Sequence, residues 1–339
     1  MTYPAVLFAV LPALLFEAAW NLSRESVRRT WFLSFMLAFP GVFVSALLIA
    51  AGMVFIGHLT WASALLFGAI VAATDPIAVV AIVRRLRAPD ELRTTIEVES
   101  LVNDGVAAVL YTIMVANALG SRYGTGATLA TFFLMTLGGG VIGYAFAQLA
   151  ALALRRSHTA WLHALVTIAL AYGAFALAQR MGLSGIIAAI VGAYVLGTQE
   201  LTFVDVRMHA AVDRLWRVLA LLANLIVFVS MGIAISLRDL AAHGAAAGVA
   251  VLTVVAVRII VVGGLLPIVA RVPKNWVGPL ILAGMRGALS LALAMSLPAS
   301  IPDRALIIDA VAAVVVATLL LPALFMAPWL RLHPPAASY

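Results

Sequence analysis

Hydrophobic residues along this chain come in runs of about 20, separated by short connectors that carry charge. A helix of about 20 residues crosses roughly 30 Å of hydrocarbon and satisfies its own backbone in lipid. The alternating segments of about ten residues that mark a membrane β-barrel are not seen in the sequence. The pattern predicts an all-α polytopic membrane protein with about eleven transmembrane helices, at residues 3–20, 31–56, 61–83, 94–118, 126–154, 159–179, 183–197, 215–236, 245–270, 276–297 and 305–329.

Composition supports this class. The 339 residues are 65% hydrophobic and 10% charged, which leaves too little polar sequence to cover a soluble globule. The sequence contains no cysteine, so disulfides and thiolate metal sites are excluded.

The net charge of +7 comes from basic residues in the connectors, which is typical of membrane orientation and not of a nucleic-acid groove. Assigning connectors alternately to the two sides places four basic residues on one side: Arg122, Arg180, Arg238 and Arg304. The other side carries Arg24, Arg28, Arg29, Arg84, Arg85, Arg87, Arg93, Arg155, Arg156, Arg207, Arg214, Arg217, Arg271, Lys274 and Arg331. This side is predicted to face the cytoplasm, with the N-terminus outside and the C-terminus inside.

Two arginines, Arg258 and Arg286, fall well inside apolar runs and need buried partners. Charge accounting makes Glu17 and Arg258 a candidate second buried pair, since each stands alone among acids and bases in its span. Arg286 is expected to pair with Glu99 or otherwise to neutralise the acidic cluster. The acidic residues within spans are Glu17, Asp75, Glu97, Glu99, Asp104 and Asp309.

Three of these charges are predicted to share one depth in the membrane. Counting about 1.5 Å per residue from the nearest cytoplasmic basic residue places Asp75, Asp104 and Arg286 roughly 14 to 18 Å deep, near the midplane. Since they belong to three different spans, we expect them to converge on one site.

The third span is predicted to break at Thr74-Asp75, because Pro76 removes a backbone donor and pushes the preceding residue toward extended geometry. Broken helices at the midplane expose carbonyls and helix ends, with which transporters bind ions. A simple proline kink is the alternative. Gly284 and Gly287 bracket Arg286 and favour a second irregular span, the tenth.

On the fourth span Ser100 and Asp104 are four residues apart and share one helix face, while Glu99 and Asn103 share the adjacent face. A hydroxyl and a carboxylate one turn apart offer two hard oxygens to an alkali cation, and carbonyls at the helix break would add more. Proton and cation would then compete for Asp104. The alternative is polar contact between helices, which leaves the cost of two carboxylates unexplained.

At these residues the sequence resembles the monovalent cation:proton antiporter family of NhaP and the eukaryotic sodium/proton exchangers. The stretches that carry the resemblance are Leu-Pro-Ala-Leu-Leu-Phe-Glu-Ala-Ala at 11–19, Ala-Thr-Asp-Pro-Ile-Ala-Val at 73–79, Glu-Ser-Leu-Val-Asn-Asp-Gly-Val-Ala at 99–107 and Met-Arg-Gly-Ala-Leu-Ser at 285–290.

The resemblance implies an inverted-repeat antiporter fold in which the third and tenth spans are discontinuous and cross. It also implies a homodimer whose protomers divide into a moving, ion-binding core and a dimerisation side. The core helices would be approximately 31–118 and 245–329, the dimerisation helices 3–20 and 159–236, and the linking helix 126–154. Family members have two further helices ahead of the segment matching 3–20, so the chain is expected to lack the first two.

The resemblance also assigns roles at the site. Asp104 would bind both Na+ and the proton, and Asp75, Ser100 and Thr74 would assist as Na+ ligands. Glu99 and Arg286 would form the stabilising ion pair of the core. Asn103 beside Asp104 matches the family's electroneutral branch, in which exchange is one for one.

The expected function is secondary antiport of Na+, Li+ or K+ against H+ in the cell membrane, with no enzyme activity and no cofactor beyond the transported ions. The expected partners are monovalent cations, protons, the lipid bilayer and a second copy of the chain. A cation channel or uniporter, an intramembrane hydrolase and a non-transporting sensor or scaffold are the alternatives. The hydrolase is disfavoured because neither Gly-x-Ser-x-Gly nor His-Glu-x-x-His occurs.

Overall fold

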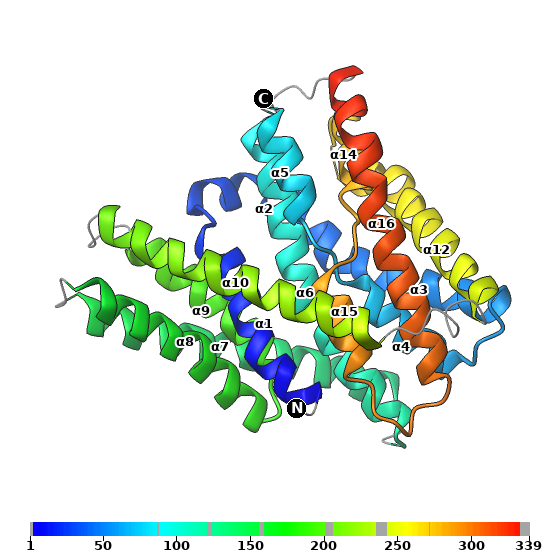
Figure 1. Cartoon of the computed structure of the whole chain (residues 1–339), viewed down its shortest axis with the longest axis horizontal. Coiled ribbons are helices and arrows are strands. Elements are labelled where there is room, and N and C mark those ends of the chain that lie inside the picture. The colour runs from blue at the N-terminus through cyan, green and yellow to red at the C-terminus, as the bar shows by residue number, and fades with distance from the viewer. Residues whose placement is uncertain are drawn as a thin grey trace. The chain divides into compact units, whose positions relative to one another are not determined.

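The computed structural model describes residues 3–86, 88–120, 124–155, 159–200, 206–234, 243–270 and 272–332, and every regular element in these ranges is helical (Figure 1). The predicted all-α class is confirmed for this part of the chain. Some basic connector residues fall outside the described residues: Arg87, Arg122, Arg156, Arg238 and Arg271.

Eight helical segments of the described part, some of them made of consecutive helices, are long and apolar enough to cross a membrane. They are Arg24–Phe55, Trp61–Arg85, Asp90–Ala118, Gly126–Leu154, Ala160–Arg180, Met208–Ile233, Gly244–Val269 and Arg304–Leu332. The other predicted spans correspond to shorter helices. Segments 3–20 and 183–197 form α1 (Tyr3–Trp20) and α9 (Gly185–Glu200). Segment 276–297 is divided between α14 (Lys274–Leu282) and α15 (Ala288–Met295).

Contacts divide the chain into two compact units, each described here by itself. The first unit comprises Met1–Arg24 and Tyr123–Val227, and the second comprises Glu25–Arg122 and Phe228–Tyr339. The helix predicted as a link, at 126–154, belongs by its contacts to the first unit.

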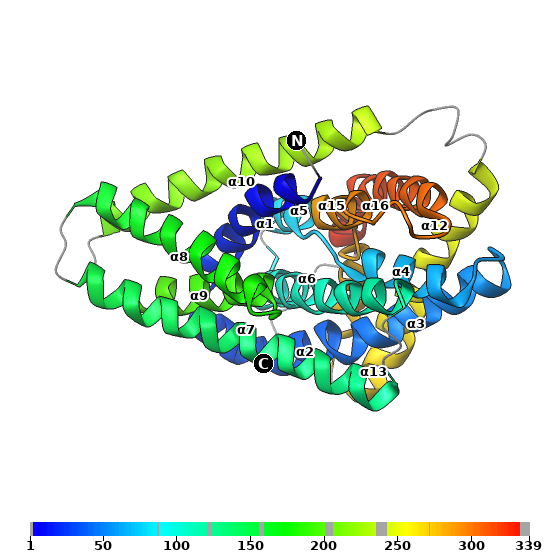
Figure 2. The ribbon, with the colours of Figure 1, turned by 90° about the horizontal axis from the view of Figure 1, so that it is seen from below.

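The first unit is built from α1, α7 (Thr125–Leu154), α8 (Ala160–Arg180), α9 and most of α10 (Val206–Ala234). Small residues let its helices approach closely, and Figure 2 shows α7, α8 and α9 side by side. A Cβ atom added at Gly143 of α7 would lie 2.2 Å from the backbone oxygen of Ala188 in α9. The buried Trp216 of α10 stacks on Phe16 of α1 and donates a 3.1 Å hydrogen bond to Thr167 of α8.

The second unit contains α2 (Arg24–Ala38), α3 (Pro40–Phe55), α4 (Trp61–Ala72), α5 (Ile77–Arg85), α6 (Asp90–Ala118), α12 (Gly244–Arg258), a π-helical turn η1 (Ile259–Leu265), α13 (Leu266–Val269), α14, α15 and α16 (Arg304–Leu332). Helix α4 packs on α3 and α6, and α12 packs on α3 and α16 (Figure 1). The predicted span 31–56 is divided into α2 and α3 because Pro40 begins a new helix.

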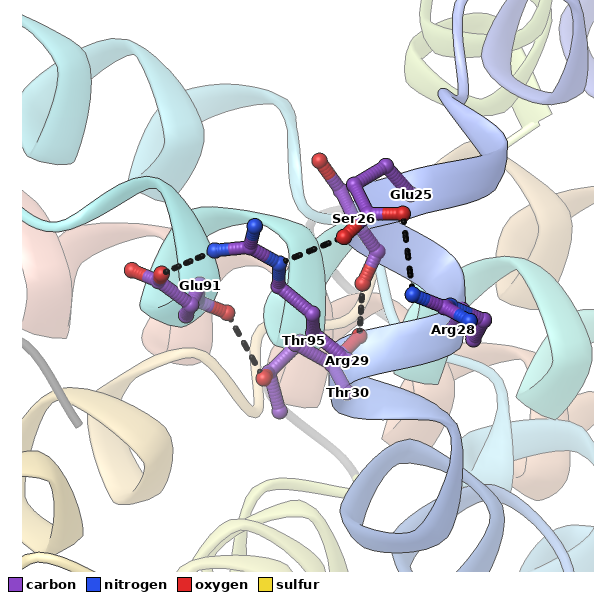
Figure 3. A network of polar contacts seen from close by, with 7 residues as sticks. All are labelled: Glu25, Ser26, Arg28, Arg29, Thr30, Glu91 and Thr95. Carbon is purple, nitrogen blue, oxygen red and sulfur yellow. Dashed lines mark hydrogen bonds and ion pairs between the residues drawn. The ribbon is translucent and has the colours of Figure 1, made fainter. Parts of the chain in front are cut away.

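Charged side chains join α2 to α6 at one end of this unit, as Figure 3 shows. Arg29 of α2 lies between Glu25 of its own helix, at 2.9 Å, and Glu91 of α6, at 3.7 Å. Thr95 of α6 donates to the backbone oxygen of Glu91 at 2.8 Å. Arg29 and Glu25 are exposed, at 60% and 56%, so solvent screens their attraction.

The close approach of α7 and α9 makes a testable prediction. Gly143→Ala forces the two backbones apart, and we expect it to destabilise the protein by about 1 to 3 kcal/mol. Gly140→Ala is the matched control in the same helix, because the nearest atoms to an added Cβ there are 4.0 Å away. Thermal unfolding of the detergent-solubilised variants checks this, and equal melting temperatures for the two variants would contradict the packing.

Candidate functional site

The third predicted span is interrupted where the sequence places the break. Helix α4 ends at Ala72 and α5 begins at Ile77. Ala73 is extended, with ψ 137°, because the chain cannot continue an α-helix into the Asp75-Pro76 pair. The predicted break is confirmed, and it leaves the buried Thr74 with backbone groups that no helix satisfies.

The tenth span is interrupted as well, between Leu282 of α14 and Ala288 of α15. The two breaks contact each other, since the Asp75 N–H donates to the Met285 carbonyl at 2.9 Å. Gly287 permits this approach, because a Cβ added there would lie 2.2 Å from an Asp75 carboxylate oxygen. The glycine that favoured an irregular span is therefore required by a close contact.

The Asp75 carboxylate lies at the start of two short helices. Its Oδ1 accepts a hydrogen bond of 2.9 Å from the Ile77 N–H in the first turn of α5. Its Oδ2 lies against Gly287, the residue immediately before α15. The partial positive charge of both helix N-termini stabilises a carboxylate at this position.

Helix α6 presents its polar face to the first break. Ser100 donates its hydroxyl hydrogen to the Thr74 carbonyl, and Asn103 Nδ2 donates to Thr74 Oγ1 at 3.1 Å. Asp104, one turn beyond Ser100, interacts with the Thr74 backbone N–H, the Asp75 carboxylate and the Arg286 guanidinium. The structure thus brings together the three charges that depth counting predicted to converge, and with them Thr74, Ser100 and Asn103.

One oxygen of the predicted ion-binding carboxylate has no assigned contact. The Oδ1 atom of Asp104 is buried and has no hydrogen-bond partner among the described residues. Thr74, which contacts both Ser100 and Asn103, and the Asp75 carboxylate, which acts on Asp104 electrostatically, belong to the same break. Their oxygens and the Ser100 hydroxyl are hard ligands suited to an alkali cation. Among the described residues, no group of three or more His, Cys, Asp or Glu residues could hold a metal ion.

The buried ion pair of the core differs from the one expected. Glu99 Oε1 lies 2.6 Å from Arg258 Nη1, and Oε2 accepts from Arg258 Nη2 at 3.1 Å. This contact corrects two predictions, the Glu99–Arg286 pair and the Glu17–Arg258 pair. Arg258 reaches Glu99 across α14, where it also donates to the Leu280 carbonyl at 2.6 Å. Gly284 makes room for it, because a Cβ there would lie 2.6 Å from Arg258 Nε.

Arg286 is buried at 3% exposure without an ion pair among the described residues. Its backbone N–H donates to Thr318 Oγ1 of α16 at 2.9 Å, while its side-chain Nε and Nη1 have no hydrogen-bond partner. Glu17 lies on α1 in the first unit, away in sequence from every other residue of the site.

Two residues that support the site were not singled out from the sequence. Ser290 of α15 donates to the Ile70 carbonyl at 3.0 Å, and the Ala73 carbonyl lies 3.4 Å away. Thr318 supports the second break through Arg286. Ser290 is the last residue of the Met-Arg-Gly-Ala-Leu-Ser stretch. Its position in the first turn of the helix after a break was the feature of the sequence that could have indicated this role.

An all-helical membrane chain in which two interrupted helices meet beside buried carboxylates is the architecture of secondary transporters. Comparison with known proteins agrees. The chain belongs to the sodium/hydrogen exchanger family, whose profile, described as "Sodium/hydrogen exchanger, transmembrane", matches residues 4–332. The resemblance seen in the sequence is confirmed.

Relatives and solved structures extend this result. The chain is 34% identical over 332 residues to the Na(+)/H(+) antiporter ApNhaP of Aphanothece halophytica, covering 95% of this chain and 63% of that protein. It is 31% identical over 336 residues to the Na(+)/H(+) antiporter NhaP of Pseudomonas aeruginosa, covering 95% and 79%. The chain spans about three fifths of the length of several curated relatives that it matches.

The fold is similar to that of the sodium proton antiporter MjNhaP1 from Methanocaldococcus jannaschii, with a TM-score of 0.80 at 21% identity over 98% of this chain and 85% of that one. The predicted antiporter fold is thereby confirmed.

The corrected ion pair makes a quantitative prediction. Removing either partner leaves an uncompensated buried charge, so Glu99→Gln and Arg258→Gln are each expected to lower the free energy of unfolding by about 3 to 5 kcal/mol. The double variant should lose much less than the sum of the two. Unfolding titrations in SDS measure this cycle. The same cycle between Glu99 and Arg286 is the control, and a larger coupling there would restore the pairing first expected.

Proposed function

We propose that this chain exchanges Na+ for H+ across the cell membrane by alternating access, with both ions competing for Asp104. The observation that carries the proposal is the buried Oδ1 of Asp104, which has no hydrogen-bond partner in the described part of the chain, on a carboxylate that interacts with residues of both helix breaks. Relatives named Na(+)/H(+) antiporters support the choice of cation.

The site holds the oxygens that Na+ requires. Asp104 supplies the charge, and Asp75, Ser100 and Thr74 supply further oxygens directly or through water. Desolvation favours the neutral, protonated carboxyl, whereas a bound cation favours the carboxylate. A site that accepts one or the other, but not both, couples the two fluxes when it opens alternately to the two sides.

Stoichiometry follows from the neighbouring residue. Asn103 is neutral, and its Nδ2 donates a hydrogen bond to Thr74 Oγ1. Asp104 therefore supplies the one carboxylate of the Asn103-Asp104 pair. One cation or one proton then neutralises it. We propose that exchange is one for one and electroneutral.

The remaining residues hold this arrangement. Glu99 and Arg258 compensate each other within the core, and Arg286 lies beside Asp104 as a positive charge. We assign the moving core to the second unit and the dimerisation side to the first unit, in a homodimer with its N-terminus outside and its C-terminus in the cytoplasm. The basic residues that set this orientation gather on one predicted side of the membrane.

The carboxylate of Asp104 is the first target for a test. Asp104→Asn should abolish Na+-dependent dequenching of a pH dye in proteoliposomes, while Asp104→Glu keeps partial activity. Asp90→Asn is the matched control on the same helix, because the Asp90 side chain is 79% exposed, and its exchange should equal the wild type. Runs with Na+, K+ and Li+ across a pH series identify the cation. Exchange at wild-type rate in Asp104→Asn would refute the assignment, and ion current without proton counterflow would identify a channel.

Electroneutrality has its own test. Because a bound cation and a bound proton leave Asp104 with the same charge, the exchange rate should hardly change when K+ and valinomycin impose a membrane potential on the proteoliposomes. Asn103→Asp adds a second carboxylate and is expected to introduce voltage dependence. A steep response of the wild type to potential would rule out one-for-one exchange.

A further inference from the structure

Beside the proposed cation site, the second unit contains a small polar pocket, which shares Asn103 and Arg286 with the surroundings of that site. Its cavity volume is about 10 Å³, which is room for one species of about the size of a water molecule. Residues from α2, α3, α4, α6, the α12–η1 junction and the second break line it: Leu37, Gly41, Val42, Ser45, Ala72, Asn103, Arg258, Val261 and Arg286. The charged side chains in this lining are both arginines.

Most of the buried side-chain polar atoms of the lining that have no partner among the described residues are donors. Arg286 Nε and Nη1 and Arg258 Nε are buried and have no partner among the described residues. Asn103 Nδ2 is committed to Thr74, and its Oδ1 is the one buried acceptor of the lining that also has no partner in the described part of the chain. The Ser45 hydroxyl is a further donor.

Arg286 is the arginine of the lining that has no ion pair within 4.0 Å among the described residues. Glu99 compensates Arg258 through two contacts. The Asp75 carboxylate lies at the N-termini of α5 and α15. Glu99 and Asp104 are close enough to interact with Arg286, but neither forms an ion pair with it within 4.0 Å among the described residues. Burial of a guanidinium without a close anionic partner is unfavourable, so an anion bound in the pocket would stabilise Arg286.

We propose that this pocket binds a small inorganic anion, for which chloride is the probe, held by Arg286 and Arg258 as a counter-charge inside the core. Guanidinium groups prefer anionic acceptors, and their charge-assisted hydrogen bonds are about twice as strong as neutral ones. The rest of the lining is apolar or small, so it suits a monatomic anion better than an organic one. The anion site is independent of which cation the protein exchanges.

Chloride-dependent stability of the purified protein tests the site. Replacing sodium gluconate by sodium chloride at constant Na+ concentration and ionic strength should raise the melting temperature of the wild type by about 2 °C or more once chloride exceeds its dissociation constant tenfold. Arg286→Gln should lose this response. Bromide in place of chloride should give an anomalous diffraction peak in contact with Arg286.

Ser45→Asp provides the sharper comparison, because it places a carboxylate in the pocket. We expect it to raise the melting temperature in gluconate and to abolish the chloride response, whereas Ser45→Asn keeps the response. A wild type that does not respond to chloride, as expected for a pocket filled by water, would overturn the proposal. An equal response in the wild type, Ser45→Asp and Arg286→Gln would also overturn it, since it would show an adventitious ion only.

Discussion

The contact between two interrupted helices is the constraint on which the rest of the second unit depends. Each break frees backbone groups that lipid cannot satisfy, so protein groups must satisfy them. The Asp75 N–H donates a hydrogen bond to the Met285 carbonyl. The Ser100 hydroxyl donates to the Thr74 carbonyl, and the Ser290 hydroxyl donates to the Ile70 carbonyl. One of these groups, the Ser100 hydroxyl, is also a proposed ligand of the cation, so the first break and the cation site share it. Such a site is rigid because loss of any one partner leaves a buried backbone group unpaired.

The positions of the breaks and the convergence of Asp75, Asp104 and Arg286 could be predicted from the sequence, because they depend on local rules. Proline and the residue before it interrupt a helix wherever they occur, and helix rise converts residue number into depth. Gly287 is a partial case. Its presence indicated irregular backbone, but only the structure shows that the Asp75 carboxylate occupies the space a side chain would fill.

The partner of Glu99 could not be predicted in the same way. Charge accounting shows that buried charges need partners, but it does not say which of two arginines lies on the correct face. Arg258 ends α12, and the π-helical turn that follows it changes the direction in which later residues point. Gly284 then leaves the space through which Arg258 reaches Glu99. These are tertiary features, which the periodicity of a single helix cannot predict.

The corrected pairing changes the charge balance of the proposed site. With Glu99 matched to Arg258, and Asp75 stabilised by the starts of α5 and α15, the charges that remain are one carboxylate, Asp104, and one guanidinium, Arg286. Binding of one Na+ or one proton adds a single positive charge in either case, so the two loaded states carry the same charge. A membrane potential then acts equally on both, and a neutral residue at position 103 is what keeps this balance.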